Sequence, residues 1–404
     1  MGSNDDTPSL AHALHKAFIL SASKPFLGYP NRQVKKSNET SIQYDWLTYE
    51  EVFQKVLHLS DSLRQISLLQ RSVVGICADN CVEWIVTDFS CTFNDYISVG
   101  LHSSWSEECM LNVLRSAETD CIVCMSCDLY KFLKASTLCL CIQHIIVIDD
   151  TNMNSNKDAF STADAQIIKK FEEDNRESTV KVHLFNSFLS NKKSVSTETE
   201  RATYDTTNYI GNDELRTITG AGGMMPCWFG LHYPIPIGES DEIYTLMYTS
   251  GTTGNPKGVA VTKNRWLLDA KSNLFLGQSE PTVVSYMSLA HGGDRGICWQ
   301  ACFAGAKIGL ISPVTHNAIE LLNNIQSIKP TFLLCMSYLW CEYFSLFKKD
   351  LEEKVVSYII ENEFYHLYLT CTSRYIFILI FVVTHRSSTV SRNSFALIDF
   401  KLLK

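Results

Sequence analysis

The chain has 404 residues, of which 46% are hydrophobic and 19% charged, as in a globular protein with a sizeable core. Its net charge of −8 comes without a basic block or stripe, which argues against binding to DNA or RNA. The N-terminus lacks the basic flank and apolar run of a signal peptide. The longest apolar run, residues 375–383, is about half of the roughly 20 residues that a membrane-spanning helix needs. We therefore expect a cytoplasmic protein.

Helices and strands are predicted to alternate from Leu47 to about residue 150, the pattern of a mostly parallel sheet covered by helices. An amphipathic helix should follow Thr48, because Thr48 and Glu51 have the spacing of a capping box. The next predicted elements are strand 72–78, helix 80–91, strand 99–101, helix 106–116 and two further strands. The predicted fold class is α/β, with layered, mostly parallel sheets and flanking helices, and residues 1–150 form its first subdomain.

Three later ranges differ in composition. Residues 151–240 are rich in Ser, Thr, Asn, Lys and Glu, which predicts a polar, partly disordered excursion with one short strand near 180–185. A second α/β subdomain is expected at 241–354, beginning with a strand at 242–248. Residues 355–404 contain no glycine or proline and keep neither a helical nor an alternating period. They are interpreted as an atypical tail outside the α/β fold.

The 15 cysteines, in a chain without an export signal, predict reduced thiols and no disulfide framework. One cluster could be written as a zinc site: Cys121, Cys124, Cys127, Cys139, Cys141 and His144. Residues 120–125 and 141–148 are, however, typical of buried strands, in which cysteine behaves as a small hydrophobe. We therefore favour packing for these cysteines and predict no metal ligands.

The segment from Tyr248 to Gly258, YTSGTTGNPKG, carries the strongest chemical signal. Its glycines permit positive φ and close approach to an anion, so successive N–H groups can point inward. Its hydroxyls add donors, and Lys257 adds a positive charge for terminal phosphates. The segment follows a predicted strand and precedes a helical pattern, but it is neither a Walker A loop nor a dinucleotide-binding loop. A flexible surface turn is the alternative, although the order of these residues favours a phosphate-binding loop.

This loop resembles the signature of the AMP-binding, acyl-adenylate-forming superfamily, Y-T-S-G-T-T-G-x-P-K-G, at every fixed position. The similarity extends over about residues 25–354 and is weak across 151–240. Two later segments, 285–295 and 329–340, resemble those of the long-chain fatty acid–CoA ligase branch, with Ser288 in place of a proline. The implied fold is the N-terminal domain of the adenylate-forming enzymes.

The resemblance implies a two-step reaction that uses ATP, Mg²⁺ and coenzyme A. The carboxylate of an acid, in this branch a long-chain fatty acid, attacks the α-phosphate of ATP, and the thiol of coenzyme A then displaces AMP. Negative charge builds on phosphoryl oxygens, so N–H donors, a lysine and Mg²⁺ are needed. The residues that would hold the β- and γ-phosphates are Thr249, Ser250, Gly251, Thr252, Thr253, Gly254, Lys257 and Gly258. The resemblance places His291, as the catalytic residue, at the junction of the acyl and nucleotide pockets.

Several residues allow a second interpretation from the sequence alone. His291 could be a structural histidine, and Arg295 could be a solvated charge on a helix. Trp299 and Phe303 are expected to pack in the core rather than line an acyl pocket. The branch also implies peripheral contact with an intracellular membrane, for which no anchor is visible, and the oligomeric state stays open.

The later motifs of the superfamily, Y-G-x-T-E, T-G-D and a small lid domain with its lysine, are not found in this sequence. We therefore expect a C-terminally truncated chain that holds phosphates, lacks ribose recognition and has little or no activity. Two other functions stay open. One is a non-catalytic nucleotide- or acyl-binding protein, and the other is an adenylation module that feeds a carrier protein or a reductase.

Overall fold

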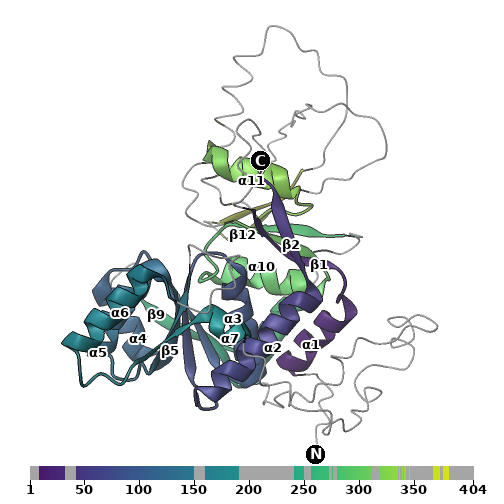
Figure 1. Cartoon of the computed structure of the whole chain (residues 1–404). Helices are drawn as coiled ribbons and strands as arrows, with labels where there is room; N and C mark the ends of the chain where they lie inside the picture. The colour runs from purple at the N-terminus through teal and green to yellow at the C-terminus, as the bar shows by residue number, and fades with distance from the viewer. Residues whose placement is uncertain are drawn as a thin grey trace, which may run out of the picture.

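Two large sheets and a separate hairpin, with helices packed on the sheet faces, make up the described part of the chain (Figure 1). The computed structural model describes residues 9–31, 42–149, 160–190, 241–249, 256–272, 280–311, 318–334, 367–373 and 376–381, with single positions between 275 and 345. Within these residues, no helix is both long and apolar enough to cross a bilayer. The predicted α/β class is confirmed.

The larger sheet has seven strands in the order β7-β6-β5-β3-β4-β8-β9. They are β3 (Val73–Cys77), β4 (Ile97–Gly100), β5 (Thr119–Met125), β6 (His144–Ile148), β7 (Lys181–Leu184), β8 (Ile243–Thr249) and β9 (Lys257–Thr262). All neighbours are parallel except β8 and β9, which form an antiparallel hairpin. β3 and β6 are buried at every position, as expected for apolar strands covered by helices on both faces.

Helices cover both faces of this sheet, with a hydrophobic core under each set. One face carries α1 (Leu10–Leu20), α2 (Tyr49–Gln65), α3 (Val82–Asn94), α7 (Phe185–Ser190), α9 (Lys263–Ala270) and α10 (Gly292–Phe303). The other carries α4 (Glu107–Ser116), a 3₁₀ turn (Ser126–Asp128), α5 (Leu129–Leu138) and α6 (Thr162–Asp174). Figure 1 shows α4, α5 and α6 grouped on the side of the strands opposite α1, α2 and α3.

The capping box predicted before α2 is present. The backbone N–H of Glu51 donates to Thr48 Oγ1 at 3.2 Å, and Glu51 Oε2 accepts the Thr48 N–H at 2.7 Å. Ser106 caps α4 in the same way through the N–H of Cys109, at 3.2 Å. These side chains satisfy N–H groups that a helix start leaves without partners, which is why their spacing locates helix starts in the sequence.

The smaller sheet has the order β10-β11-β1-β2. Its strands are β1 (Pro25–Pro30), β2 (Tyr44–Thr48), β10 (Thr282–Ser285) and β11 (Lys307–Leu310), and α11 (Ala318–Ile328) packs on it. The separate hairpin consists of β12 (Leu367–Ser373) and β13 (Ile376–Phe381). Both large sheets combine strands from ranges 1–150 and 241–354, so the two ranges do not form separate layers.

The range 151–240 contains more regular structure than its polar composition indicated. Strand β7 lies where a short strand was predicted. Helices α6 and α7, on either side of it, were not predicted, and α6 begins at the N-cap Ser161. Phe171 of α6 is buried in the second core, and Ile167 and Ile168 pack against the same core, so apolar contacts anchor an otherwise polar helix. Residues 191–240 lie outside the described residues.

Candidate functional site

The strand order creates a topological switch point between β3 and β4. The chain leaves β3 into α3 on one face of the sheet and leaves β4 into α4 on the other face. In open α/β sheets, ligands bind outside the carboxyl ends of the strands at such a point, because the two connections diverge there. Asn80 follows β3 and His102 follows β4, so the topology alone places both at the expected ligand site.

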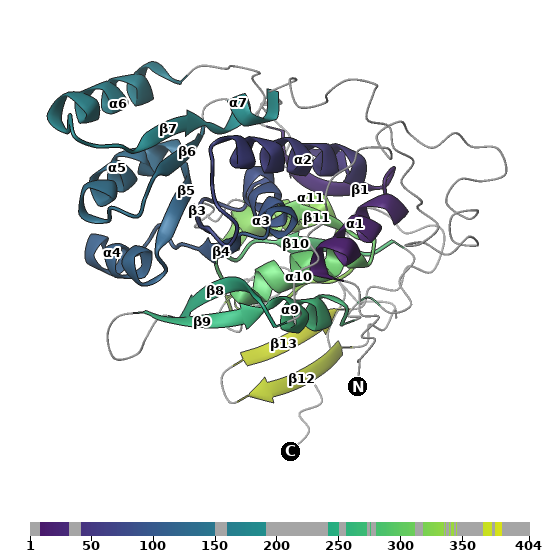
Figure 2. The ribbon, with the colours of Figure 1, turned by 90° about the horizontal axis from the view of Figure 1, so that it is seen from below.

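The predicted phosphate loop leaves the same edge of the sheet, one strand further along. β8 is parallel to β4, with Val99 paired to Leu246, so both strands run toward this edge. The hairpin closes below the loop where Thr249 pairs with Lys257, and Thr249 Oγ1 donates to the Lys257 carbonyl at 3.5 Å. Figure 2 shows β8 and β9 side by side along the edge of the molecule.

Thr249, Lys257 and Gly258 are thus the predicted phosphate-binding residues that the structure describes, at the base of the hairpin. The remaining five positions of that prediction lie outside the described residues: Ser250, Gly251, Thr252, Thr253 and Gly254. The side chain of Lys257 is exposed and stands at the start of β9, next to the loop. A phosphate-binding role of this segment stays a prediction.

The expected strand–loop–helix context is wrong, because a strand follows the loop. Residues after Gly258 read Val-Ala-Val-Thr, and two β-branched valines favour an extended chain that pairs back on β8. The next helix, α9, begins only at Lys263. The N-terminus of α9 therefore does not follow the loop directly, as the expected context required.

An aromatic surface lies beside the base of the hairpin. The Tyr248 ring covers Gly258, where an added Cβ would lie 3.0 Å from the ring, so a side chain there would press on Tyr248. The Tyr248 hydroxyl hydrogen bonds Ser116 Oγ at 2.7 Å, which fixes the ring against the end of α4. Trp105 stands edge-on to Tyr248 at 6.5 Å between ring centroids.

His291, which follows Leu289 and Ala290, occupies the N-cap position of α10, and part of its side chain stays in solvent. Its ring lies 4.4 Å from the ring of His102 between centroids, and His102 in turn contacts Trp105 at 4.9 Å. Burial, and secondarily the neighbouring His291, lowers the pKa of His102 to about 4. Partial burial also lowers the pKa of His291. Both imidazoles are therefore neutral near pH 7.

The backbone before His291 is held at the carboxyl ends of β3 and β4. Asn80 Nδ2 donates to the Met287 carbonyl at 2.7 Å, and its Oδ1 accepts the Leu289 N–H at 3.1 Å. A Cβ on Gly100, the last residue of β4, would lie 2.6 Å from Ala290 Cα, so only glycine allows this approach. These contacts bring His291 next to His102.

Asp294 is the last member of a buried hydrogen-bond network that also includes Asn80 and Ser285. Its Oδ2 accepts the Ser285 hydroxyl at 2.5 Å and the Asn80 amide at 3.4 Å. Within the described residues its Oδ1 has no hydrogen-bond partner. Burial raises the pKa of Asp294 to about 7, although Ser285 and Asn80 act in the opposite direction.

Arg295 is fully buried, so its interpretation as a solvated helix charge is wrong. Its Nε donates to Asp88 Oδ2 at 3.0 Å and its Nη2 to Asp88 Oδ1, and both side chains are only 2% exposed. The remaining donors reach side chains on β4 and β8: Ser98, Tyr244 and Thr245. The ion pair is thus bidentate and its other N–H groups are satisfied, as a buried charge requires.

Trp299 packs in the core as predicted, and its indole N–H donates to Asp88 at 2.9 Å. Its ring contacts Phe89 edge-on at 4.8 Å. Phe303 is half-buried against the same core and contacts Trp299. The apolar face of α10 therefore packs into the first hydrophobic core.

The sequence profile of the family described as AMP-binding enzyme matches residues 29–358. The chain belongs to this family. Fatty acyl-CoA synthetase A of Dictyostelium discoideum is 23% identical over 74% of this chain and 37% of its own length. Long chain acyl-CoA synthetase 5 of Arabidopsis thaliana is 25% identical over 70% of this chain and 36% of its own length. The chain thus spans little more than a third of these relatives, which place it near the long-chain fatty acid–CoA ligase branch.

A solved structure with the same fold is the adenylation domain of a carboxylate reductase from Mycobacterium chelonae. Its TM-score is 0.65 at 13% identity, with 89% of this chain and 50% of that chain covered. The layered sheets of this AMP-binding family member therefore have the architecture of known adenylation domains.

The cysteines of β5 pack in the core, as the sequence interpretation favoured. Cys121 and Cys124 are buried in the first and second cores respectively, because residues three apart on a strand face opposite sides. His144 Nδ1 and His183 Nε2 hydrogen bond each other at 3.0 Å on neighbouring strands. Across the described ranges, no three His, Cys, Asp or Glu side chains converge as a metal would require.

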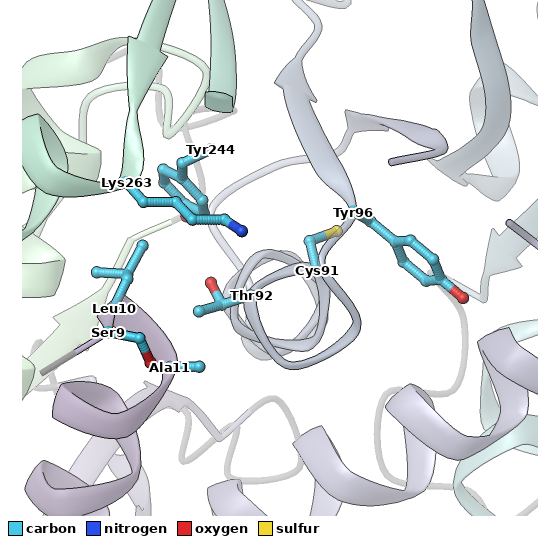
Figure 3. A pocket seen from close by; sticks show the side chains of 8 residues that line it. All are labelled: Ser9, Leu10, Ala11, Cys91, Thr92, Tyr96, Tyr244 and Lys263. Atoms are coloured by element: carbon cyan, nitrogen blue, oxygen red, sulfur yellow. The ribbon is translucent and has the colours of Figure 1, made fainter. Parts of the chain in front are cut away.

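A small cavity between α1, α3 and β8 is separate from this site (Figure 3). Lys263 lines it together with Thr92 and Tyr244. The amine of Lys263 is already paired with Asp95 and Glu242. The cavity has room for no more than a water molecule, so it offers no substrate pocket in this family member.

Sequence patterns did not indicate Asn80, His102 or Asp88, although each is central to the site or its support. One signal was available for His102, because a polar residue directly after a predicted parallel strand is a candidate ligand-binding position. Asn80, two residues after the predicted strand 72–78, carries a similar signal, whereas Asp88, inside the predicted helix 80–91, carries none. Their partners lie more than two hundred residues away along the chain.

Proposed function

We propose that this protein activates a carboxylic acid, a long-chain fatty acid, as acyl-AMP at the expense of ATP and transfers the acyl group to coenzyme A. The observation that carries the proposal is that the β8–β9 hairpin and His291 stand at one sheet edge, joined through His102, Trp105 and Tyr248. Its curated relatives named fatty acyl-CoA and long chain acyl-CoA synthetases support the acid and the acceptor.

The residues supply separate parts of this chemistry. Lys257 and the Thr249 hydroxyl stand where they can orient terminal phosphates, and a fixed lysine offsets the repulsion between an incoming carboxylate and ATP. His291 lies on the acid side, held by the backbone clamp of Asn80. Holding the two reactants in a fixed relation lowers the entropic part of the barrier, which is the main task of such a site.

Mg²⁺ would neutralise phosphate charge when bound with the nucleotide. In the parts of the chain that the structure describes, no acidic cluster forms a cage for it. The residues at the base of the hairpin, Lys257 and the Thr249 hydroxyl, fit an ion that is held mainly by phosphate oxygens and water, as Mg²⁺ commonly is. Lys257 would then act beside the ion rather than replace it.

A second candidate function is an adenylation module that passes the acyl group to a carrier protein or a reductase. The adenylation domain of a carboxylate reductase shares this fold, and a fold can serve both acceptors. Supplying either coenzyme A or a phosphopantetheine-bearing carrier protein to the acyl-adenylate distinguishes the two. Faster release of AMP with the carrier would favour the module.

ATP binding by the purified 404-residue chain is the first test, measured by calorimetry with and without Mg²⁺ and followed by ATP–pyrophosphate exchange with a fatty acid. Lys257→Ala should weaken ATP binding by about 10- to 100-fold, the usual worth of a hydrogen bond to a charged group. Lys271→Ala, an exposed lysine after α9, removes the same charge away from the loop and should leave ATP binding unchanged.

Equal ATP affinity in wild type and Lys257→Ala would remove the hairpin from the nucleotide site. Measurable pyrophosphate exchange would exclude a non-catalytic nucleotide- or acyl-binding protein.

A further inference from the structure

We propose that His102 is a second acid-binding residue of this site, and that it acts with His291 to hydrogen bond the substrate carboxylate. This inference rests on the proposed function and names the group that recognises the acid. It assigns a role to a residue at the end of β4 that the phosphate-loop signature does not include.

The first support is the position of the two rings. Their centroids are 4.4 Å apart and their planes meet at 55°, so the two imidazoles lie in direct contact at one place in the site. The backbone of each residue is held in place: the His102 carbonyl accepts the Trp105 N–H at 3.1 Å, and the His291 N–H donates to the Ser288 carbonyl at 2.9 Å. The close approach of Gly100 to Ala290 then sets the distance between the segment that carries His102 and the segment that carries His291.

The second support is that both imidazoles are open to a ligand. Neither ring has a hydrogen-bond partner among the described residues, whereas buried histidines usually pair. His102 is half-buried and His291 is exposed, so both edges can be reached from solvent. A neutral imidazole has one N–H donor, and a carboxylate has two oxygens that accept, so the two rings and one carboxylate match in number.

The third support is charge. The pKa of His102 is lowered to about 4 by burial and then by the neighbouring His291, and partial burial lowers that of His291. Both rings therefore stay neutral at pH 7. Neutral N–H donors can orient a carboxylate without forming an ion pair. The acid then keeps the charge density that it needs as a nucleophile toward phosphorus.

A second histidine pair in the same sheet shows the contrasting case. His144 on β6 is buried and His183 on β7 is partly buried, with the pKa of His183 lowered to about 4 by burial, the neighbouring His144 and Lys181. Their ring nitrogens, however, hydrogen bond each other at 3.0 Å. That pair satisfies itself, so it provides a matched control of similar chemistry away from the site.

The test measures binding of dodecanoate and dodecanol, below micelle-forming concentrations and without ATP, to the purified 404-residue chain and its variants. His102→Phe keeps an aromatic ring but loses the N–H donor, and His102→Gln keeps a donor on a flexible side chain. We expect His102→Phe to weaken dodecanoate binding roughly 10-fold while dodecanol binding changes less than about 2-fold. His102→Gln should recover most of the loss, and His183→Phe should bind both ligands as wild type does.

An equal loss of acid and alcohol binding in His102→Phe would show a change of shape alone and overturn the proposal. The same loss of acid binding in His183→Phe, or no acid binding by the wild type, would also overturn it. Failure of the proposed function has a different signature, because it appears as absent ATP binding or pyrophosphate exchange. Acid binding that depends on His102 would survive that result.

Discussion

Replacing Asp294 by asparagine should stabilise the protein increasingly as the pH rises. The carboxyl group is buried, and its Oδ2 accepts from Ser285 and Asn80 while its Oδ1 has no partner within the described structure. Asparagine keeps one acceptor oxygen for Ser285 and Asn80 and removes the possibility of a buried charge. The amide nitrogen of asparagine takes the place of the unpaired Oδ1, so one unpaired polar atom replaces another. The effect of that exchange on the free energy of unfolding does not depend on pH.

The magnitude follows from the pKa of Asp294, which burial raises from 3.8 to about 7. Between these values the folded state keeps its proton while the unfolded state loses it, so the stability of the wild type falls with rising pH. The loss is about 1.4 kcal/mol per pH unit, or roughly 4 kcal/mol at pH 8. The variant does not titrate there, so its advantage over wild type should grow by roughly 3 kcal/mol between pH 5 and pH 8.

Urea unfolding followed by tryptophan fluorescence at pH 5, 6, 7 and 8, at constant ionic strength, measures this difference directly. Asp164→Asn is the matched control, because Asp164 is also buried but both its oxygens accept serine hydroxyls, at 2.7 and 2.8 Å. An amide nitrogen cannot accept, so this control should lose about 1 to 3 kcal/mol at pH 8. A gap between wild type and Asp294→Asn that stays constant from pH 5 to pH 8 would refute the reasoning.

Three further substitutions test how the site is supported, each by its free energy of unfolding in urea. Arg295→Met leaves the Asp88 carboxylate buried without its counter-charge and should cost about 3 to 5 kcal/mol of stability. Its control, Arg265→Met, removes an exposed ion pair and should cost less than about 1 kcal/mol. Equal losses in the two variants would contradict the burial argument. Gly100→Ala should cost about 1 to 3 kcal/mol of stability and shift the NMR signals of the His291 ring, because the new Cβ would lie 2.6 Å from the backbone of Ala290. Unchanged signals would show that this contact does not position His291. Gly293→Ala should be neutral or stabilise by up to about 1 kcal/mol, because nothing lies within 4 Å of its Cβ position, and a clear loss would show that the space is used.

Sequence patterns located the elements whose stability is local. The capping box at Thr48 marked α2, and the apolar runs marked β3, β5, β6 and β8, because each signal depends on neighbours within a few residues. The order of strands in the sheets was not readable. β1 pairs with β11 and β2 although β11 lies almost three hundred residues away, and such pairings depend on the whole fold.

The residues of the candidate site also divide into those with a local sequence signal and those whose position depends on the whole fold. The predicted phosphate loop stood out because its glycines, hydroxyls and lysine lie within one short segment, whereas the residues that support its surroundings are distant in sequence. Arg295 could be interpreted as a solvated charge, since the sequence does not show that Asp88 stands opposite it. The strand β9 was missed because six extended residues before a helix, two of them within the loop motif, give too short an alternation to separate from the helical pattern.

Arg295 gives a physical reason why the two halves of the site hold a fixed relation. It belongs to the helix that begins beside His291, and its guanidinium donates to Thr245 on β8, the strand that leads to the hairpin, and to Ser98 on β4, the strand that leads to His102. A charge buried this deeply tolerates little displacement, because moving any partner would leave an unsatisfied polar group in the core. In the proposed reaction the carboxylate must approach phosphorus along one line, so a rigid frame between acid and phosphate residues favours the attack. The buried Arg295–Asp88 pair thus fixes the relation between α10, which begins beside His291, and the strands β4 and β8 that lead to His102 and to the hairpin.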